Sequence, residues 1–278
     1  MPKNYSLHTQ DNEIIDVTVH FTDLTDFGKI IVFVHGFKGF KDWGFGPYLA
    51  EYFSKQGFFV LTFNFSLNGI ESGTQDFTEI DKFARNTISR EVEELNFVIA
   101  HLKNGDFGEI SNNPSIGLLG HSRGGGVSIL AAAQNEDVNA VATWAAVSDF
   151  DRYSDRQKKQ WHDIGYFEVK NSRTGQVMRM NESYLEDIEK HAKEKLGVLK
   201  AVANLKKPLF LAHGEQDLAV PAAECETIFN NADKDIAEKM IIPSTGHTFD
   251  IKHPFEGSNA KFDSLLNKTS EFFKIYLG

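Results

Sequence analysis

Ser122 is the residue of this chain whose neighbours best suit a nucleophile. It lies in the segment Gly120–Gly124, which has the Gly-x-Ser-x-Gly form of a nucleophile elbow. The apolar run before it, 115–119, predicts a buried strand, and the run after it, 124–133, predicts a helix. A serine on so sharp a turn needs small neighbours, and Gly120 and Gly124 satisfy that need. The spacing therefore predicts a serine displayed on a strand-to-helix turn.

A serine hydroxyl is a poor nucleophile unless a base removes its proton and an acid orients that base. In the chain order serine, acid, histidine that accompanies such elbows, the candidates are Asp217 and His247. Each follows a predicted strand, and catalytic groups of parallel sheets collect at the carboxyl ends of strands. We expect Ser122 to attack an acyl carbonyl while His247 takes its proton and Asp217 holds the imidazole. Water would then release the acyl group.

Other side chains compete for the two partner roles. The competitors are Glu215 and Asp149 for the acid, and His121, His213 and His253 for the base. His121 and His213 precede a serine or a glycine inside motifs in which they more often shape a turn. We expect His35 to pack in its loop. Asp217 and His247 are favoured by their places in the pattern.

The segments around these residues alternate between strand-like and helix-like patterns. Strands are predicted at 14–21, 29–34, 58–63, 115–119, 140–145, 208–212 and 239–242, and helices at 48–55, 86–103, 124–133, 222–231 and 262–276. The first strand reads as an edge strand, and 29–34 as a central one buried on both faces. Such alternation predicts an α/β fold with a mostly parallel central sheet covered by helices on both faces.

Residues 149–206 break this alternation because they are mostly polar and charged, with scattered aromatic residues. We therefore expect a core domain made of 1–148 and 207–278, and an insertion at 149–206. Trp161, Tyr166 and Phe167 are candidates for substrate contact. They could equally form the small core through which the insertion packs on the sheet, and both readings stay open.

The composition disfavours several classes of function. Within 278 residues, 41% hydrophobic content can build a large core, and a net charge of −10 argues against nucleic acid or an anionic membrane as the partner. The same charge mildly favours a neutral or cationic small-molecule substrate. Histidine spacings typical of metal sites, a phosphate loop and a complete dinucleotide motif are all missing, so we expect neither metal nor cofactor.

The cysteine content and the apolar runs of the sequence lead to further expectations. Cys225 is the single cysteine, which excludes an intramolecular disulfide and predicts an inert buried thiol. Neither a signal-peptide core nor a run of membrane-span length is present, so we expect a soluble, cytoplasmic protein. The sequence leaves the oligomeric state open.

The ordered motifs resemble those of the α/β-hydrolases. His35-Gly36-Phe37 follows an early strand, the elbow surrounds Ser122, the acid loop runs from Asp217 to Pro221, and Gly246–Phe249 contains the histidine. The likeness covers almost the whole chain and is greatest to the branch of dienelactone-hydrolase-like proteins and bacterial feruloyl or cinnamoyl esterases. It implies an α/β-hydrolase fold in which 149–206 forms a small cap.

The resemblance also implies an oxyanion hole and a reaction. The hole would use the backbone N–H groups of Phe37 and Arg123, and the reaction would be hydrolysis of a small or medium carboxylic ester. A serine peptidase or amidase, and a thioesterase or acyltransferase, share this chemistry and remain alternatives. A non-catalytic binding protein is a further one, but it would be expected to have lost a triad member. The Arg123 side chain could bind a substrate carboxylate or pair with an acidic neighbour. Lys38 and Lys41 could likewise face the substrate or be solvated, and solvation is favoured.

Overall fold

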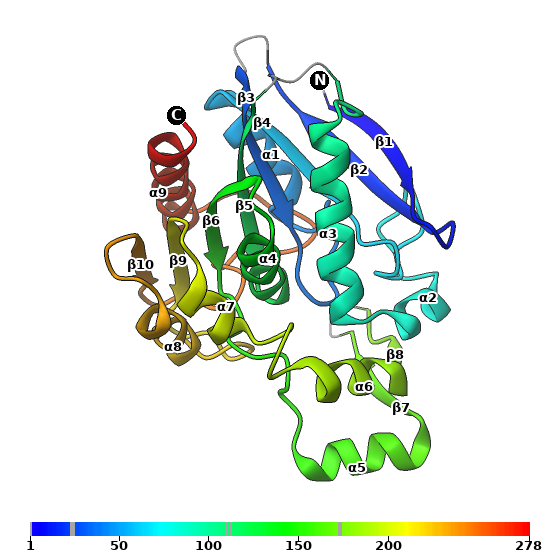
Figure 1. Cartoon of the computed structure of the whole chain (residues 1–278). Coiled ribbons are helices and arrows are strands. Elements are labelled where there is room, and N and C mark those ends of the chain that lie inside the picture. The colour runs from blue at the N-terminus through cyan, green and yellow to red at the C-terminus, as the bar shows by residue number, and fades with distance from the viewer. Residues whose placement is uncertain (1, 23–25, 109–110, 112, 172–173) are drawn as a thin grey trace.

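The core of the protein is a twisted sheet with helices on both faces (Figure 1). The computed structural model describes residues 2–22, 26–108, 111, 113–171 and 174–278. Within them, the eight-stranded sheet has the order β1-β2-β4-β3-β5-β6-β9-β10. Its strands are β1 (Lys3–His8), β2 (Ile14–His20), β3 (Asp26–Val34), β4 (Phe58–Phe63), β5 (Ser115–His121), β6 (Val138–Trp144), β9 (Leu209–Gly214) and β10 (Ala237–Ile242). β1 and β2 pair antiparallel, and the strands from β4 to β10 in this order pair parallel. The predicted mostly parallel sheet is confirmed.

Helices cover the sheet because its central strands are apolar on both faces, so each face needs a partner. One face packs against α1 (Gly46–Lys55) and α9 (Ala260–Tyr276). The other packs against α3 (Ile88–Lys103), α4 (Arg123–Gln134), α7 (Val198–Asn204) and α8 (Ala223–Asn231). The loops at the carboxyl ends of the parallel strands are therefore held from both sides.

The sequence pattern located most of these elements and misplaced the edge of the sheet. Residues 14–21 were expected at the edge, but β1 lies outside β2 and takes that place. β1 has little apolar character, being largely exposed, and it is held by backbone pairing to β2. The expected helix 86–103 begins at Ile88, where the Thr87 side chain caps it, and a short helix α2 (Ile80–Arg85) precedes it.

The region expected as an insertion forms its own small layer beyond the sheet (Figure 1). It contains α5 (Asp155–Ile164), the hairpin β7 (Tyr166–Lys170) and β8 (Val177–Asn181), and α6 (Glu182–His191). α7 also falls inside 149–206, yet it packs on α4 and α8 as a covering helix of the sheet. The domain boundaries themselves stay a prediction.

An aromatic cluster holds this layer together. Trp161 is fully buried and stacks on Phe167 and Tyr184, with ring centroids 5.0 and 5.8 Å away, while Tyr153 meets it edge-on. The layer is fastened to the core by Asp187, whose carboxylate accepts the backbone N–H of Ser89 at the start of α3. The aromatic residues thus serve as a packing core for the segment.

The structure also bears on the reactivity of Cys225 and on whether a helix could cross a membrane. Burial raises the pKa of the Cys225 thiol to about 12, which disfavours the reactive thiolate. Among the described residues, none of the helices has both the length and the apolar character needed to cross a membrane.

Candidate active site

Ser122 lies at the turn between β5 and α4 in a backbone conformation that few non-glycine residues adopt, with φ 56° and ψ −121°. The turn is possible only because its neighbours lack side chains. A Cβ on Gly120 would lie 2.3 Å from the carbonyl oxygen of Gly124, and a Cβ on Gly124 would lie 2.3 Å from that of Val34. The expected need for glycine at both positions is therefore explained by close backbone contact.

The structure brings the three residues of the sequence hypothesis together in one hydrogen-bonded row. His247 Nε2 lies 2.9 Å from Ser122 Oγ, and its Nδ1 lies 2.7 Å from Asp217 Oδ2. Asp217 follows β9 and His247 follows β10, neighbouring parallel strands whose carboxyl ends meet at the same edge. The Asp217 side chain is fully buried, while that of His247 is 23% exposed. The spacing suits proton transfer from the serine to an oriented imidazole.

Asp217 is held as a carboxylate by its surroundings. Burial alone would raise its pKa, but donors to the carboxylate from His213 and His247 outweigh burial and hold the pKa well below its usual range. Its Oδ1 accepts the backbone N–H groups of Ala219 and Val220 at 2.8 and 2.9 Å. His213 Nε2 must carry a proton because it donates to the Val220 carbonyl at 2.8 Å, and it also faces Asp217 Oδ2 at 3.2 Å. The sequence predicted that His213 shapes a turn, but its role as a donor to Asp217 was missed, and only its place four residues before Asp217 could have suggested that role.

The competing residues occupy other positions. Glu215 and Asp149 are exposed and accept backbone N–H groups of Ser244 and Asp151. The ring of His121 contacts the carbonyl oxygen of His247 at 2.9 Å, and burial lowers its pKa to about 3. His253 Nδ1 accepts the N–H of Gly44 at 2.9 Å. None of these contacts His247 as Asp217 does.

The loop after β3 passes directly over the serine. A Cβ on Gly36 would lie 2.9 Å from both Ser122 Cβ and the His121 carbonyl oxygen, so only glycine permits this approach. Among the described residues, the backbone N–H groups of Phe37 and Arg123 have no hydrogen-bond partner. Arg123 is the first residue of α4, whose positive end points to the serine. Both groups are thus available to an oxygen that becomes negative in the reaction.

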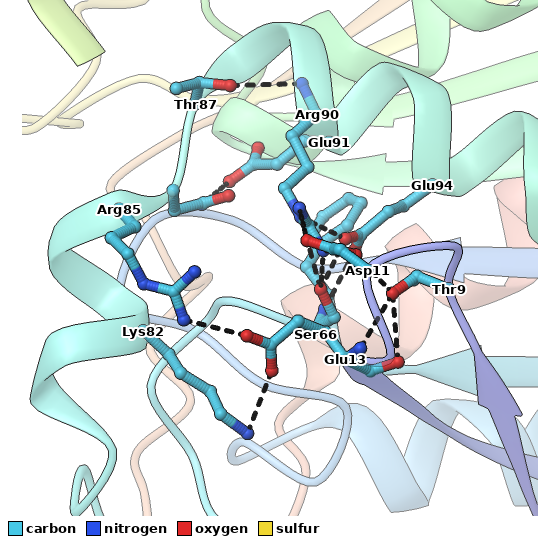
Figure 2. A network of polar contacts seen from close by, with 12 residues as sticks. Thr9, Asp11, Glu13, Ser66, Lys82, Arg85, Thr87, Arg90, Glu91 and Glu94 are labelled. Atoms are coloured by element: carbon cyan, nitrogen blue, oxygen red, sulfur yellow. Dashed lines mark hydrogen bonds and ion pairs between the residues drawn. The ribbon is translucent and has the colours of Figure 1, made fainter. Parts of the chain in front are cut away.

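Buried polar contacts hold that loop from behind. His35 Nδ1 donates to the Gly36 carbonyl, so its Nε2 is free to accept the N–H of Phe65. Burial lowers the pKa of His35 to about 4, which keeps it neutral in this role. The next residue, Ser66, is held by Glu94 through its N–H and its hydroxyl. Figure 2 shows Arg90 reaching from α3 to Glu94, Ser66 and Asp11. The β1–β2 turn, α3 and the loop after β4 therefore form one network.

The Arg123 side chain is paired inside the protein. It is 10% exposed, its Nη2 lies 3.2 Å from the buried Glu91 carboxylate, and its Nη1 lies 3.2 Å from the hydroxyl of Tyr184. Burial raises the pKa of Glu91, and the guanidinium opposes that shift. Of the two sequence alternatives, pairing with an acidic neighbour is the one observed.

A cavity of about 800 Å³ opens above the serine. The core loops contribute Gly36, Phe37, Ser122, Val220 and His247, and the segment beyond β6 contributes Tyr153, Val169, Asn171 and Tyr184. Trp161, Tyr166 and Phe167, the candidates for substrate contact, are not among its described lining residues. The reason is physical: Trp161 and Phe167 stack inside the aromatic cluster, and Tyr166 packs against Arg179. Their neighbours Tyr153 and Tyr184 were not singled out, because sequence alone does not tell which ring of a cluster faces outward.

A family comparison shows to which family the chain belongs. The model of Peptidase_S9, the prolyl oligopeptidase family, matches residues 43–278. The chain belongs to the prolyl oligopeptidase family. Its members share the α/β-hydrolase fold, and the chain is a hydrolase of that superfamily. No curated protein shows significant sequence similarity to it.

Solved structures of this fold cover nearly the whole chain. The α/β-hydrolase GrgF from Penicillium sp. sh18 has a TM-score of 0.76 at 17% identity, covering 100% of this chain and 99% of that one. Est1E from Butyrivibrio proteoclasticus, solved with ferulic acid bound, has a TM-score of 0.71 at 18% identity, covering 96% and 97%. The Pyrococcus furiosus esterase has a TM-score of 0.65 at 19% identity, covering 100% and 92%. At these identities the likeness shows the fold, and the fold predicted from the sequence motifs is confirmed.

Proposed function

We propose that this protein is a serine esterase that hydrolyses a small or medium carboxylic ester through an acyl-enzyme. Ser122 attacks the ester carbonyl while His247 Nε2 takes the hydroxyl proton, and Asp217 stabilises the imidazolium that forms. The N–H groups of Phe37 and Arg123 hold the oxyanion. The proton then passes from His247 to the leaving alcohol, and a water molecule repeats the sequence on the acyl group.

The observation that supports this most is the unbroken row from Ser122 Oγ through the imidazole to Asp217, at 2.9 and 2.7 Å. It lies beneath two backbone donors that have no other partner among the described residues. A structural serine would need neither a buried, oriented acid nor a cavity above it. A non-catalytic ligand-binding role is therefore disfavoured.

A serine peptidase or amidase is the second candidate, and the family match favours it. The same residues attack an amide carbonyl, and only the leaving group changes. A thioesterase or acyltransferase would likewise share the acyl-enzyme. The ester assignment draws on neighbours of the same fold that are esterases, such as the Pyrococcus furiosus enzyme.

A covalent probe tests the proposal. A fluorophosphonate should add mass at Ser122, as located by peptide mass spectrometry, and should abolish hydrolysis of 4-nitrophenyl acetate. The Ser122→Ala variant should fold with an unchanged circular dichroism spectrum, resist labelling and lose roughly 10⁴- to 10⁶-fold in kcat. A wild-type protein that is neither labelled nor active on any ester would overturn the assignment. Specificity constants on matched esters, thioesters and aminoacyl amides then rank the candidates.

A further inference from the structure

The cavity has a charge opposite to that of the protein as a whole. The chain has a net charge of −10. Yet the described residues that line the cavity include the cations Lys38, Arg123, Arg152 and Lys252, and no aspartate or glutamate. Surface charges further than about 8–10 Å are screened by salt, so a substrate in the cavity responds chiefly to the local set.

Three of these four cations pair with a carboxylate that does not line the cavity. Arg123 pairs with Glu91 at 3.2 Å, and Arg152 pairs with Glu224 at 2.5 Å. Lys252 pairs with Glu256 at 2.9 Å on the surface. His35 and His121 also line the cavity, and burial lowers their pKa values to about 4 and 3, so they are neutral near pH 7.

Lys38 is the exception. It is half-buried, and no carboxylate of the described residues lies within ion-pair distance of its Nζ. Its ammonium donates to the backbone carbonyl of Lys170 at 2.9 Å and lies 5.5 Å from the centre of the Phe37 ring. One of its three N–H donors is thereby used. Of the two readings open for Lys38, the one that faces the substrate site fits the structure, because the hairpin β7–β8 and the Phe37 loop hold its side chain at the cavity.

We propose that Lys38 is an anion-binding residue of the substrate site, and that the natural ester carries a carboxylate on the acyl or the alcohol part. This inference rests on the proposed esterase function and names the substrate class for the same site. Two free N–H groups of a partly desolvated ammonium, next to the Phe37 donor, match a carboxylate in charge and hydrogen bonding. The neutral or cationic substrate expected from net charge is replaced by an anionic one, because local charge outweighs the screened total.

Matched ester pairs test this directly. The acyl-side pair is the 4-nitrophenyl monoester of adipic acid and the 4-nitrophenyl ester of 6-oxoheptanoic acid, in which a methyl ketone replaces the carboxylate. The alcohol-side pair is 4-acetoxybenzoate and 4-acetoxybenzamide. In the wild type, kcat/KM should favour the anionic member of at least one pair by roughly 10- to 100-fold, and this preference should fall as salt increases. Equal rates within both pairs, or a preference for the neutral members, would overturn the inference without any variant being made.

Variants locate the preference. Lys38→Gln should lower kcat/KM for the preferred anionic ester by roughly 10- to 100-fold and change the neutral partner less than about threefold, while Lys38→Arg should keep most of the preference. Lys170→Gln is the control, because it removes an exposed positive charge nearby that does not line the cavity. An equal loss on both members in Lys38→Gln would assign Lys38 a structural role instead. Neutral-ester turnover with fluorophosphonate labelling but no anionic preference would sink this inference alone, whereas absence of both would sink the esterase function.

Discussion

The floor and the wall of the cavity are built in different ways. The floor consists of the turns after β3, β5, β9 and β10, where a single added methyl group would collide with backbone at Gly36, Gly120 or Gly124. The wall, from Tyr153 to Tyr184, is an aromatic cluster held by ring stacking and a few polar contacts. Backbone contacts tolerate almost no substitution, whereas ring packing can be rearranged. The difference indicates that the floor determines which reaction occurs and the wall which substrate enters.

The largest effect is expected in the floor, at Asp217. Asp217→Asn keeps an oxygen for the Ala219 and Val220 N–H groups but removes the charge that orients and stabilises the imidazolium. We expect kcat on 4-nitrophenyl acetate to fall by roughly 10³- to 10⁴-fold with little change in thermal stability. Steady-state kinetics and a thermal melt measure both.

The exposed competitors provide the controls for this substitution. Asp149→Asn and Glu215→Gln should each leave kcat within about twofold, since neither carboxylate contacts His247. If either lowers kcat as much as Asp217→Asn, the acid has been assigned to the wrong loop.

A smaller effect is expected where the floor approaches the serine from above. The Cβ of Gly36→Ala would lie 2.9 Å from Ser122 Cβ and from the His121 carbonyl oxygen, so the loop must shift and move the Phe37 N–H. We expect a loss of roughly 10²- to 10³-fold in kcat with KM nearly unchanged, as for removal of one oxyanion donor. Gly246→Ala is the matched control, because the nearest atom to its Cβ lies 3.9 Å away. Equal losses in both variants would argue against a specific role for the Phe37 loop.

The floor could be predicted from the sequence because its constraints are local. Buried strands leave continuous apolar runs, and close backbone contacts leave glycines beside Ser122, so the element order and the places of Asp217 and His247 follow from pattern. The sequence pattern did not reveal the hydrogen bonds that support the floor from distant parts of the chain. The link from His35 through Phe65 and Ser66 to Glu94 and Arg90 joins residues far apart in the chain, and no spacing rule connects them.

The contacts of the wall could not be predicted from the sequence, because they consist of ring packing, which can be arranged in more than one way. For Trp161, Tyr166 and Phe167 the sequence left substrate contact and packing open, because the orientation of a ring within a cluster depends on all of its neighbours. The edge strand β1 escaped notice because its stability comes from pairing and not from its own apolar pattern.

A moderate effect on substrate binding is expected from emptying the wall. Trp161 is fully buried against Phe167 and Tyr184, so Trp161→Ala should destabilise the 155–191 segment by about 3–5 kcal/mol. KM for a bulky aryl ester should rise roughly tenfold as Tyr184 loses its support. The rate of fluorophosphonate labelling at Ser122 should change less than about threefold. Mass spectrometry of samples quenched at successive times measures this rate. A collapse of labelling would show that the floor depends on the wall.

The last prediction concerns the pH dependence of stability, to which a histidine of the floor and a histidine of the wall contribute with opposite signs. Burial lowers the pKa of His35 in the floor to about 4, whereas Glu182 and Glu189 raise the pKa of the exposed His162 in the wall. Below pH 6.5 the unfolded chain binds a proton at His35 that the folded protein does not bind. The free energy of unfolding therefore falls progressively as the pH falls toward 4, by about 3 kcal/mol in all. His162 acts oppositely: its contribution is present below pH 6.5 and is lost as the pH rises through its raised pKa.

His35→Gln separates these contributions. The glutamine amide can donate to the Gly36 carbonyl and accept from the Phe65 N–H without titrating, so the variant should lose less stability than the wild type between pH 6.5 and 4. Urea unfolding at each pH gives the two curves, and the matched variant His162→Gln should lose its difference from the wild type as the pH rises above the raised pKa of His162. Parallel wild-type and His35→Gln curves would mean that His35 takes up its proton in the folded protein as readily as in the unfolded chain, and would contradict a neutral His35 behind the Phe37 loop.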